Sequence, residues 1–294
     1  MQMLSVDEAQ VARWRGLRDE ISRAAAAEKV SLLAAEATRH RADNLRTIDA
    51  AQQGHIGGDM SITDVLTTLY YAVLDIDPAD PDADGRDRLV LSKGHCAAAL
   101  YTVLSSCGYF SPSELPTFMA PLSPLNGHPN RLKVPGVEAN TGPLGHGLPI
   151  ATGIAKAAKL RGASNRVFVL LGDGELQEGS NWEAFMAASH FKLDNLVAVV
   201  DRNRLQQGAR TEDTNSLDPL PERLSAFGWE VREIDGHDFT QLLAAFTPST
   251  SGRPVAVVAH TIKGKGISFM EDDVAWHHKV PSPEQVEAAL KELV

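Results

Sequence analysis

Cysteine is scarce in this sequence, and long apolar runs are absent from it. The two cysteines, Cys96 and Cys107, have a spacing that suits no zinc or redox motif. No stretch approaches the ~20 consecutive apolar residues that a membrane-spanning helix requires. Residues 1–28 are charged and lack the continuous apolar segment of a secretory signal. We therefore predict a cytoplasmic protein with no membrane partner.

Basic charge is also in short supply. Lysine and arginine total 28 residues against 38 aspartates and glutamates, which gives a net charge of −10. This balance argues against nucleic acid or an anionic membrane as the main ligand. The chain has 294 residues, of which 43% are hydrophobic, so it can build a substantial core. That length suits one large α/β domain or two small ones. We find no internal repeat or low-complexity linker, which favours one domain.

Proline is absent from residues 6–46, where alanine, leucine, glutamate and arginine dominate and predict a helix. The glycine-rich turn at residues 53–58 ends this pattern. Ser61 or Thr63 is a suitable capping residue for a second helix that we expect to reach Val73. A third helix is expected over residues 151–160.

We expect short strands at residues 89–91, 167–171, 196–200, 230–234 and 255–260. These segments alternate with helical patterns or loops. Such alternation predicts an α/β fold with a mostly parallel, doubly wound sheet that carries helices on both faces.

The most informative motif is Gly172-Asp173-Gly174, which directly follows the second predicted strand. The next predicted strand delivers Asn203 at its end. Adjacent parallel strands joined by one helix bring their carboxyl ends together. A carboxylate and an amide oxygen would then lie beside glycine backbone that a phosphate can approach, as Mg²⁺ prefers. The glycine motif alone would be an ordinary turn, but Asn203 at the matching place favours a metal and diphosphate site.

Two other motifs do not meet the requirements of ligand sites. Residues 80–85 match the first half of a calcium-binding loop, but Leu91 stands where the bidentate carboxylate should be. Residues 263–266, Lys-Gly-Lys-Gly, lack the residue order of a phosphate loop. We expect an acidic surface loop and a glycine-rich turn, respectively.

Four histidines lie beside glycine, proline or tryptophan in predicted loops: His55, His95, His128 and His277. Histidine transfers protons near neutral pH and bonds to hydroxyl or phosphate groups. A single histidine of this kind is more often structural, although a loop position slightly favours function.

The glycine-rich loop at residues 140–147 allows two interpretations. It could be a helix start packed tightly against the sheet, or backbone that lies along a planar ring. Glu178 and Glu183 would by default be solvated charges at a helix start.

Taken in order, these motifs resemble the transketolases, and specifically the amino-terminal chain of the two-chain kind. The matching segments share their order along the chain and lie at residues 54–58, 87–95, 126–129, 141–145, 171–179, 201–203, 235–238, 260–266 and 275–277. The resemblance begins near residue 36. It implies a thiamine diphosphate-binding domain over residues 36–294, preceded by an N-terminal helical extension over residues 1–35.

The resemblance also implies roles for individual residues. Asp173, Asn203 and the main-chain carbonyl of Leu205 would hold Mg²⁺ or Ca²⁺. Further contacts to thiamine diphosphate would come from His95, Gly142, Leu144, Gly172, Gly174, Glu175, Asn203 and His277. His55 and His128 would face the donor sugar and assist proton transfer. Glu178 and Glu183 would lie at a subunit interface in a carboxylate relay that links paired active sites.

The implied activity is transfer of a two-carbon ketol unit between sugar phosphates, or from a modified sugar. Few residues follow His277, so a separate C-terminal transketolase subunit would be required, giving an α2β2 heterotetramer. Ile56, His146, Gln207 and His278 depart from the usual family residues. Two alternatives remain: the α chain of another thiamine-dependent enzyme, such as a 2-oxo acid dehydrogenase, and a non-catalytic scaffold homologue.

Overall fold

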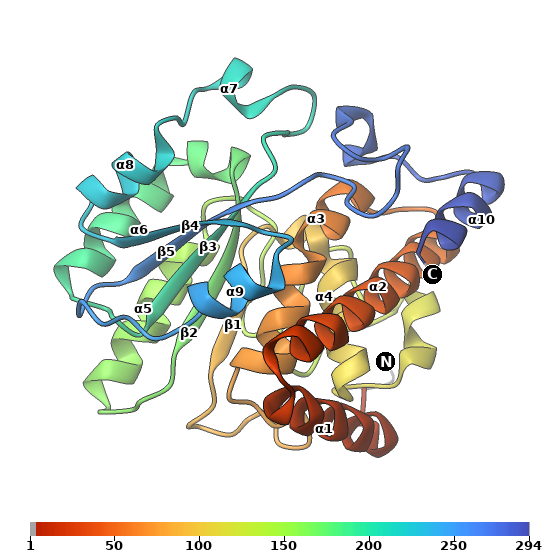
Figure 1. Ribbon diagram of the computed structural model, residues 1–294, viewed down its shortest axis with the longest axis horizontal. Helices are drawn as coiled ribbons and strands as arrows, with labels where there is room; N and C mark the ends of the chain where they lie inside the picture. Colours follow the sequence, from red (N-terminus) through yellow and green to blue (C-terminus); the bar gives the residue numbers. More distant parts are fainter. Residues whose placement is uncertain (1–3, 294) are drawn as a thin grey trace.

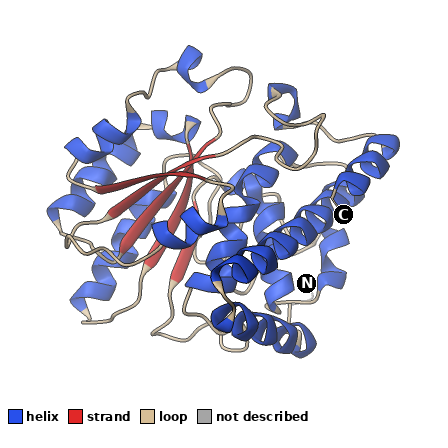
Figure 2. Cartoon of the chain, in the orientation of Figure 1, coloured by secondary structure: helices blue, strands red, loops and turns tan. Residues whose placement is uncertain are grey.

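The computed structural model describes residues 4–293 and contains one parallel sheet with helices on both faces (Figures 1 and 2). The strands are β1 Arg88–Leu91, β2 Val167–Gly172, β3 Leu196–Arg202, β4 Glu230–Asp235 and β5 Val255–His260. They lie in the order β1-β2-β3-β5-β4, and every neighbouring pair is parallel. The predicted fold class is confirmed, and all five predicted strands are present.

Ten α-helices are recorded in the described part of the chain. They are α1 Glu8–Arg23, α2 Ala26–Ala51, α3 Ile56–Thr68, α4 Ala97–Cys107, α5 Gly147–Leu160, α6 Gly179–His190, α7 Thr211–Thr214, α8 Leu220–Ala226, α9 Phe239–Ala245 and α10 Pro283–Glu292. A π-helical turn, Leu69–Val73, continues α3. None of the helices within residues 4–293 has both the length and the apolar character needed to cross a membrane.

Side chains from the sheet enter two separate cores because successive strand residues point to opposite faces. On β2, Phe168 and Leu170 join the core that includes side chains of α1–α4 and α9. Val169 and Leu171 join the core built with α5, α6 and α8. Figure 1 shows these two groups of helices on opposite sides of the sheet. Because both faces are covered, the central strands are almost continuously apolar.

The N-terminal helical prediction needs correction. The single helix expected over residues 6–46 is two helices, because Ala24 and Ala25 adopt extended backbone between α1 and α2. Helix α1 packs on the domain, where Trp14 Nε1 donates to the carbonyl of Tyr70 at 3.2 Å. Helix α2 runs across residue 35, where the predicted extension ends.

The predicted start of the next helix was also wrong. Helix α3 begins at Ile56, well before Ser61 and Thr63. The hydroxyl of Ser61 bonds to the carbonyl of Gly58 and to Asp201, and that of Thr63 donates to the carbonyl of Asp59 one turn earlier. These hydroxyls therefore serve contacts inside the fold, and neither caps the helix.

Candidate active site

A cavity of about 600 Å³ opens at the carboxyl ends of the central strands. Parallel α/β sheets bind ligands at this edge, because the loops that follow the strands meet there. The lining residues come from loops after β1, β2, β3 and β5 and from the turn before α3. Of the predicted site residues, the lining contains His55, His95, Gly142, Leu144, Gly172, Asp173, Gly174, Glu175, Glu178, Asn203, Leu205 and His277.

Asp173 and Asn203 are brought together by the pairing of β2 with β3, in which Gly172 lies opposite Asp201. The backbone N–H of Arg204 donates to Oδ2 of Asp173 at 2.7 Å, and that of Gly174 donates to Oδ1 at 2.7 Å. The strand ends therefore meet as expected from the separation of the two motifs.

Leu205 and Asn203 line the same cavity as Asp173. Oδ1 of Asn203 accepts from the backbone N–H of Leu205 at 3.1 Å, while its Nδ2 donates to Asp201 at 3.2 Å. Asp201 thereby sets the orientation of the amide. The donor set of one carboxylate, one amide oxygen and one carbonyl consists of hard oxygens and suits Mg²⁺ or Ca²⁺ completed by phosphate oxygens.

Residues 4–293 contain no group of three or more His, Cys, Asp or Glu side chains that could hold a metal ion. One orphaned group supports a bound ligand instead. Oε1 of Gln206 is buried, lines the cavity wall and has no hydrogen-bond partner among the described residues. Buried polar atoms are rarely left unpaired, so the residues present fit a bound polar group.

Arg202 is a contact of Asp173 that the sequence analysis missed. Its guanidinium group, only 1% exposed, lies 3.1 Å from Asp173, 2.6 Å from Glu212 and 3.0 Å from Asp218. Burial raises the pKa of Asp173, and the charge of Arg202 opposes that rise. The alternation of side chains along β3 is the feature of the sequence that could have identified Arg202. Its side chain must point to the opposite side of the sheet from those of Asp201 and Asn203.

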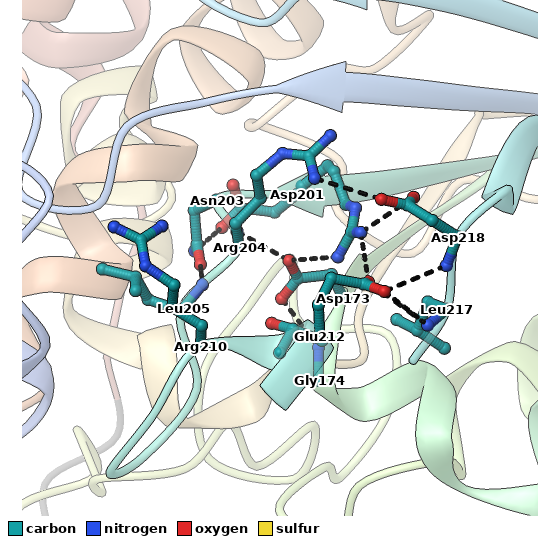
Figure 3. A network of polar contacts seen from close by, with 12 residues as sticks. Asp173, Gly174, Asp201, Asn203, Arg204, Leu205, Arg210, Glu212, Leu217 and Asp218 are labelled. Carbon is teal, nitrogen blue, oxygen red and sulfur yellow. Dashed lines mark hydrogen bonds and ion pairs between the residues drawn. The ribbon is translucent and has the colours of Figure 1, made fainter. Parts of the chain in front are cut away.

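The segment after β3 is folded by the same network. Glu212 accepts hydrogen bonds from the backbone N–H groups of Leu217 and Asp218 and from the Ser216 hydroxyl. Arg204 pairs with Asp218 at 3.2 Å. Figure 3 shows these carboxylates converging on the arginines beside Asp173. The segment 204–218, of which Leu205, Gln206 and Gln207 line the cavity, is thus attached to the predicted metal ligand.

Lys93 and Asp201 form a fully buried ion pair behind Asn203. The hydroxyls of Ser61 and Thr261 also donate to Asp201. Burial opposes the charge of Lys93, but Asp201 raises its pKa overall. This network joins the ends of β1, β3 and β5 to α3, and so fixes the floor of the cavity.

Glu175 connects the chain segments around the cavity by hydrogen bonds. Its carboxylate accepts from the backbone N–H of Gly145 at 2.9 Å, from that of Gly172 at 3.1 Å, and from the hydroxyl of Ser92. Gly145 has φ +81°, and a side chain there would meet Cβ of Glu178 at 2.6 Å. Glycine is therefore required at this close approach, and Glu175 positions the loop that carries Gly142 and Leu144.

Four imidazoles converge on one side of the cavity. The ring centroid of His55 lies 5.2 Å from that of His95, 5.5 Å from that of His277 and 4.6 Å from that of His278. His128 lies at the edge of this group, where a Cβ on Gly142 would be 3.3 Å from its Cδ2.

The pKa values of these histidines are low. Burial, and then the neighbouring cationic groups, lower the pKa of His55 to about 4 and that of His277 to about 3. Burial also lowers the pKa values of His95 and His128. His55 and His277 are therefore neutral at physiological pH, so each of these two rings has one N–H donor and one acceptor nitrogen.

Lys263 is a second residue without an assigned role in the sequence analysis, which interpreted its segment as a glycine-rich turn. The turn is present, but Lys263 is buried and lines the cavity. Its Nζ lies 2.8 Å from Nδ1 of His277 and donates to the carbonyl of Leu205 at 3.2 Å. Burial and the charge of Lys93 lower its pKa to about 8. The feature of the sequence that could have identified Lys263 is a lysine in the turn that follows a predicted strand.

Glu178 and Glu183 are not brought together with the histidines. Both are exposed. Glu178 lines the cavity, whereas Glu183 lies on α6 outside the lining residues.

Comparison with known proteins decides the family. The model of the transketolase thiamine diphosphate binding domain matches residues 33–293. The chain belongs to the transketolase family. It is 44% identical over 267 residues to an apulose-4-phosphate transketolase subunit of Phocaeicola vulgatus, a match covering 90% of this chain and 95% of that protein. It is 40% identical over 242 residues to the 6-deoxy-6-sulfo-D-fructose transketolase subunit SqwG of a Clostridium species, covering 82% and 88%.

Solved transketolases have the same fold. The structure from Campylobacter jejuni superposes with a TM-score of 0.84 at 31% identity over 89% of this chain. The match covers 42% of that longer transketolase chain, whereas the Phocaeicola and Clostridium proteins are matched over most of their length. The resemblance to the N-terminal chain of a two-chain transketolase is therefore confirmed, and it is favoured over the 2-oxo acid dehydrogenase alternative.

Proposed function

We propose that this transketolase chain binds thiamine diphosphate with Mg²⁺ or Ca²⁺ at the cavity and, with a separate partner subunit, transfers two-carbon ketol units between sugar phosphates. The observation that carries the proposal is that Asp173, Asn203 and Leu205 line one cavity together with a cluster of histidines. The cofactor, when bound, supplies an electron sink for carbon–carbon bond cleavage.

Each residue is assigned to one part of the bound cofactor. Asp173, Asn203 and the carbonyl of Leu205 hold the metal. Gly172, Gly174, His95 and His277 line the diphosphate end, to which we add Lys263 because its ammonium group is near both Leu205 and His277. Glu175 acts through the loop that it holds, and Gly142 and Leu144 lie along the cofactor rings.

Proton transfer is assigned to histidine. His55 and His128 face the donor sugar, where a neutral imidazole can accept a hydroxyl proton or return one. The low pKa of His55, about 4, keeps an acceptor nitrogen available at neutral pH.

A partner subunit is supported by exposed apolar residues on α5 and in the loop before it. Leu144, which lines the cavity, and Ile150 are each 37% exposed, and Leu160 at the end of α5 is 75% exposed. Gly153, on the same face of α5, has open space around it. We propose that these residues and the exposed Glu178 and Glu183 lie at interfaces of an α2β2 heterotetramer in the cytoplasm, and that residues 1–35 form an extension to the domain at 36–294.

The donor sugar is proposed from the relatives. Two of them are named for apulose 4-phosphate and 6-deoxy-6-sulfo-D-fructose, so modified ketoses belong in any substrate screen beside ordinary ketose phosphates. If no donor is used in that screen, the result would favour a non-catalytic scaffold homologue.

The test is reconstitution. The chain is co-purified with its partner, and the pair is loaded with Mg²⁺ and thiamine diphosphate and assayed against a panel of ketose phosphates and modified ketoses. We expect ketol transfer by the pair and none by this chain alone. A fully loaded pair that transfers no ketol unit from any donor would overturn the proposal.

A further inference from the structure

The histidine cluster has one member with no role in the proposed function. His278 follows His277 directly, lines the cavity and is exposed. Its ring centroid lies 4.6 Å from that of His55 at an interplanar angle of 68°. His55, His95 and His277 are only partly exposed, so His278 stands at the solvent side of the cluster.

The two cationic groups of the cavity near His55 already have partners. Lys93 is paired with Asp201, and Lys263 contacts His277 and the carbonyl of Leu205. No hydrogen bond from the ring of His55 or of His278 is recorded within residues 4–293. Two adjacent imidazoles that face a cavity without protein partners are available to a ligand.

The chemistry of this pair selects a class of ligand group. A neutral imidazole offers one donor and one acceptor, which matches a hydroxyl group. The two rings lie side by side at the cavity, with centroids 4.6 Å apart. Adjacent hydrogen-bonding rings suit a polyol segment, which carries several neighbouring hydroxyl groups.

We propose that His278 and His55 together contact the hydroxylated carbon chain of the donor ketose, which makes His278 a specificity-determining residue. The inference rests on the proposed transketolase activity of the loaded pair.

Two substitutions separate hydrogen bonding from ring volume. His278→Phe keeps an aromatic ring and removes both hydrogen-bonding nitrogens, whereas His278→Asn keeps a polar group and removes the ring. His190→Asn is the matched control, because His190 is an exposed histidine on α6 that does not line the cavity.

In the reconstituted pair, loaded with Mg²⁺ and thiamine diphosphate, we expect His278→Phe to raise KM for the best donor about tenfold, which corresponds to about 1.4 kcal/mol. Cofactor affinity, measured by fluorescence titration, should stay within about twofold, and kcat should change less than KM. His278→Asn should retain part of the wild-type KM, and His190→Asn all of it.

A second readout does not require activity. The charged or titratable groups that lower the pKa of His55 are His278, His128, Lys263 and Lys93. Removing His278 should therefore move the His55 titration, followed by NMR of the imidazole protons, toward higher pH. His190→Asn should leave it in place.

The outcomes distinguish the two proposals. An active wild-type pair whose donor KM is the same in His278→Phe overturns the role of His278 and leaves the transketolase activity standing. A loaded wild-type pair that is inert toward every ketose overturns the proposed function and the specificity role together. An unchanged His55 titration in both His278 variants contradicts the ring contact itself.

Discussion

Nζ of Lys263 lies 2.8 Å from Nδ1 of His277. When the lysine is an ammonium group, it can only donate, so Nδ1 must be the acceptor and the proton of neutral His277 resides on Nε2. The second hydrogen bond of Lys263, to the carbonyl of Leu205, fixes its position. One buried lysine thereby sets the tautomer of a histidine at the diphosphate end of the cavity.

Lys263→Met should weaken cofactor binding, because it removes a positive charge from the diphosphate end and leaves the tautomer of His277 unset. We expect at least a tenfold rise in the Kd for thiamine diphosphate at saturating Mg²⁺, measured by calorimetry. The control is Lys265→Met, whose ammonium group pairs with Glu271 at 3.4 Å near the surface. Equal affinity in the two variants would contradict the assignment.

Asp173→Ala should abolish the metal dependence of cofactor binding. The carboxylate is the one charged member of the predicted donor set, and Mg²⁺ depends on such hard oxygen ligands. Titration of thiamine diphosphate with and without Mg²⁺ measures the effect. Asp194→Ala serves as the control, because Asp194 pairs with Lys159 at the surface. Wild-type, metal-dependent affinity in Asp173→Ala would remove Asp173 from the site.

Arg202→Met should lower the free energy of unfolding by about 3–5 kcal/mol, since removing one partner leaves a buried carboxylate uncompensated. Arg202 is 1% exposed and contacts Asp173, Glu212 and Asp218. Urea unfolding of the chain without cofactor measures this loss.

Arg210→Met provides the comparison for Arg202. Its pair with Asp272 is 3.4 Å long and exposed on both sides, and such pairs contribute about 1 kcal/mol or less. Similar losses in the two variants would show that the buried network does not stabilise the segment after β3.

His128→Ala should reduce turnover more than cofactor affinity. General acid–base groups typically contribute about 10²–10⁴-fold in rate, so we expect kcat of the reconstituted pair to fall at least 100-fold. The Kd for thiamine diphosphate should stay within about threefold. Unchanged turnover would exclude His128 from proton transfer.

Mild acid should destabilise the chain when no cofactor is bound. Burial lowers the pKa of His55 to about 4 and that of His277 to about 3 in the folded state, against about 6.5 in the unfolded chain. Between pH 6.5 and 4 the unfolded state binds more protons, so stability falls as pH falls. Urea unfolding at pH 7.5 and 5.5 should show this loss.

The double variant His55→Asn/His277→Asn tests the origin of that acid sensitivity. It removes two groups whose protonation favours the unfolded state, so its loss of stability between pH 7.5 and 5.5 should be smaller than that of the wild type. An equal loss in both proteins would assign the effect to other groups.

The central strands β2, β3 and β5 could be predicted from sequence because they are short apolar runs buried on both faces. Gly172-Asp173-Gly174 and Asn203 mark the carboxyl ends of β2 and β3. The start of α3 could not be predicted from sequence. Ser61 is a residue type that commonly caps helices, but its hydroxyl bonds instead to Asp201, which is far away in sequence. Propensity describes local contacts only, and this contact is tertiary.

The supporting residues of the site were missed for a related reason. Arg202 and Lys263 acquire their roles from partners on other strands and turns, Asp173 and His277. Neither residue belongs to a motif with a local chemical signature. The proximity of His278 to His55 likewise depends on how the turn before α3 meets the turn that follows β5.

Glu175 has a consequence for redesign of this enzyme. A single carboxylate fastens three segments of the chain, at Ser92, Gly145 and Gly172, so none of them can shift without releasing the others. New substrate preferences are therefore more readily introduced through side chains that project from this frame, such as Gln207 and His278, than by remodelling the loops themselves.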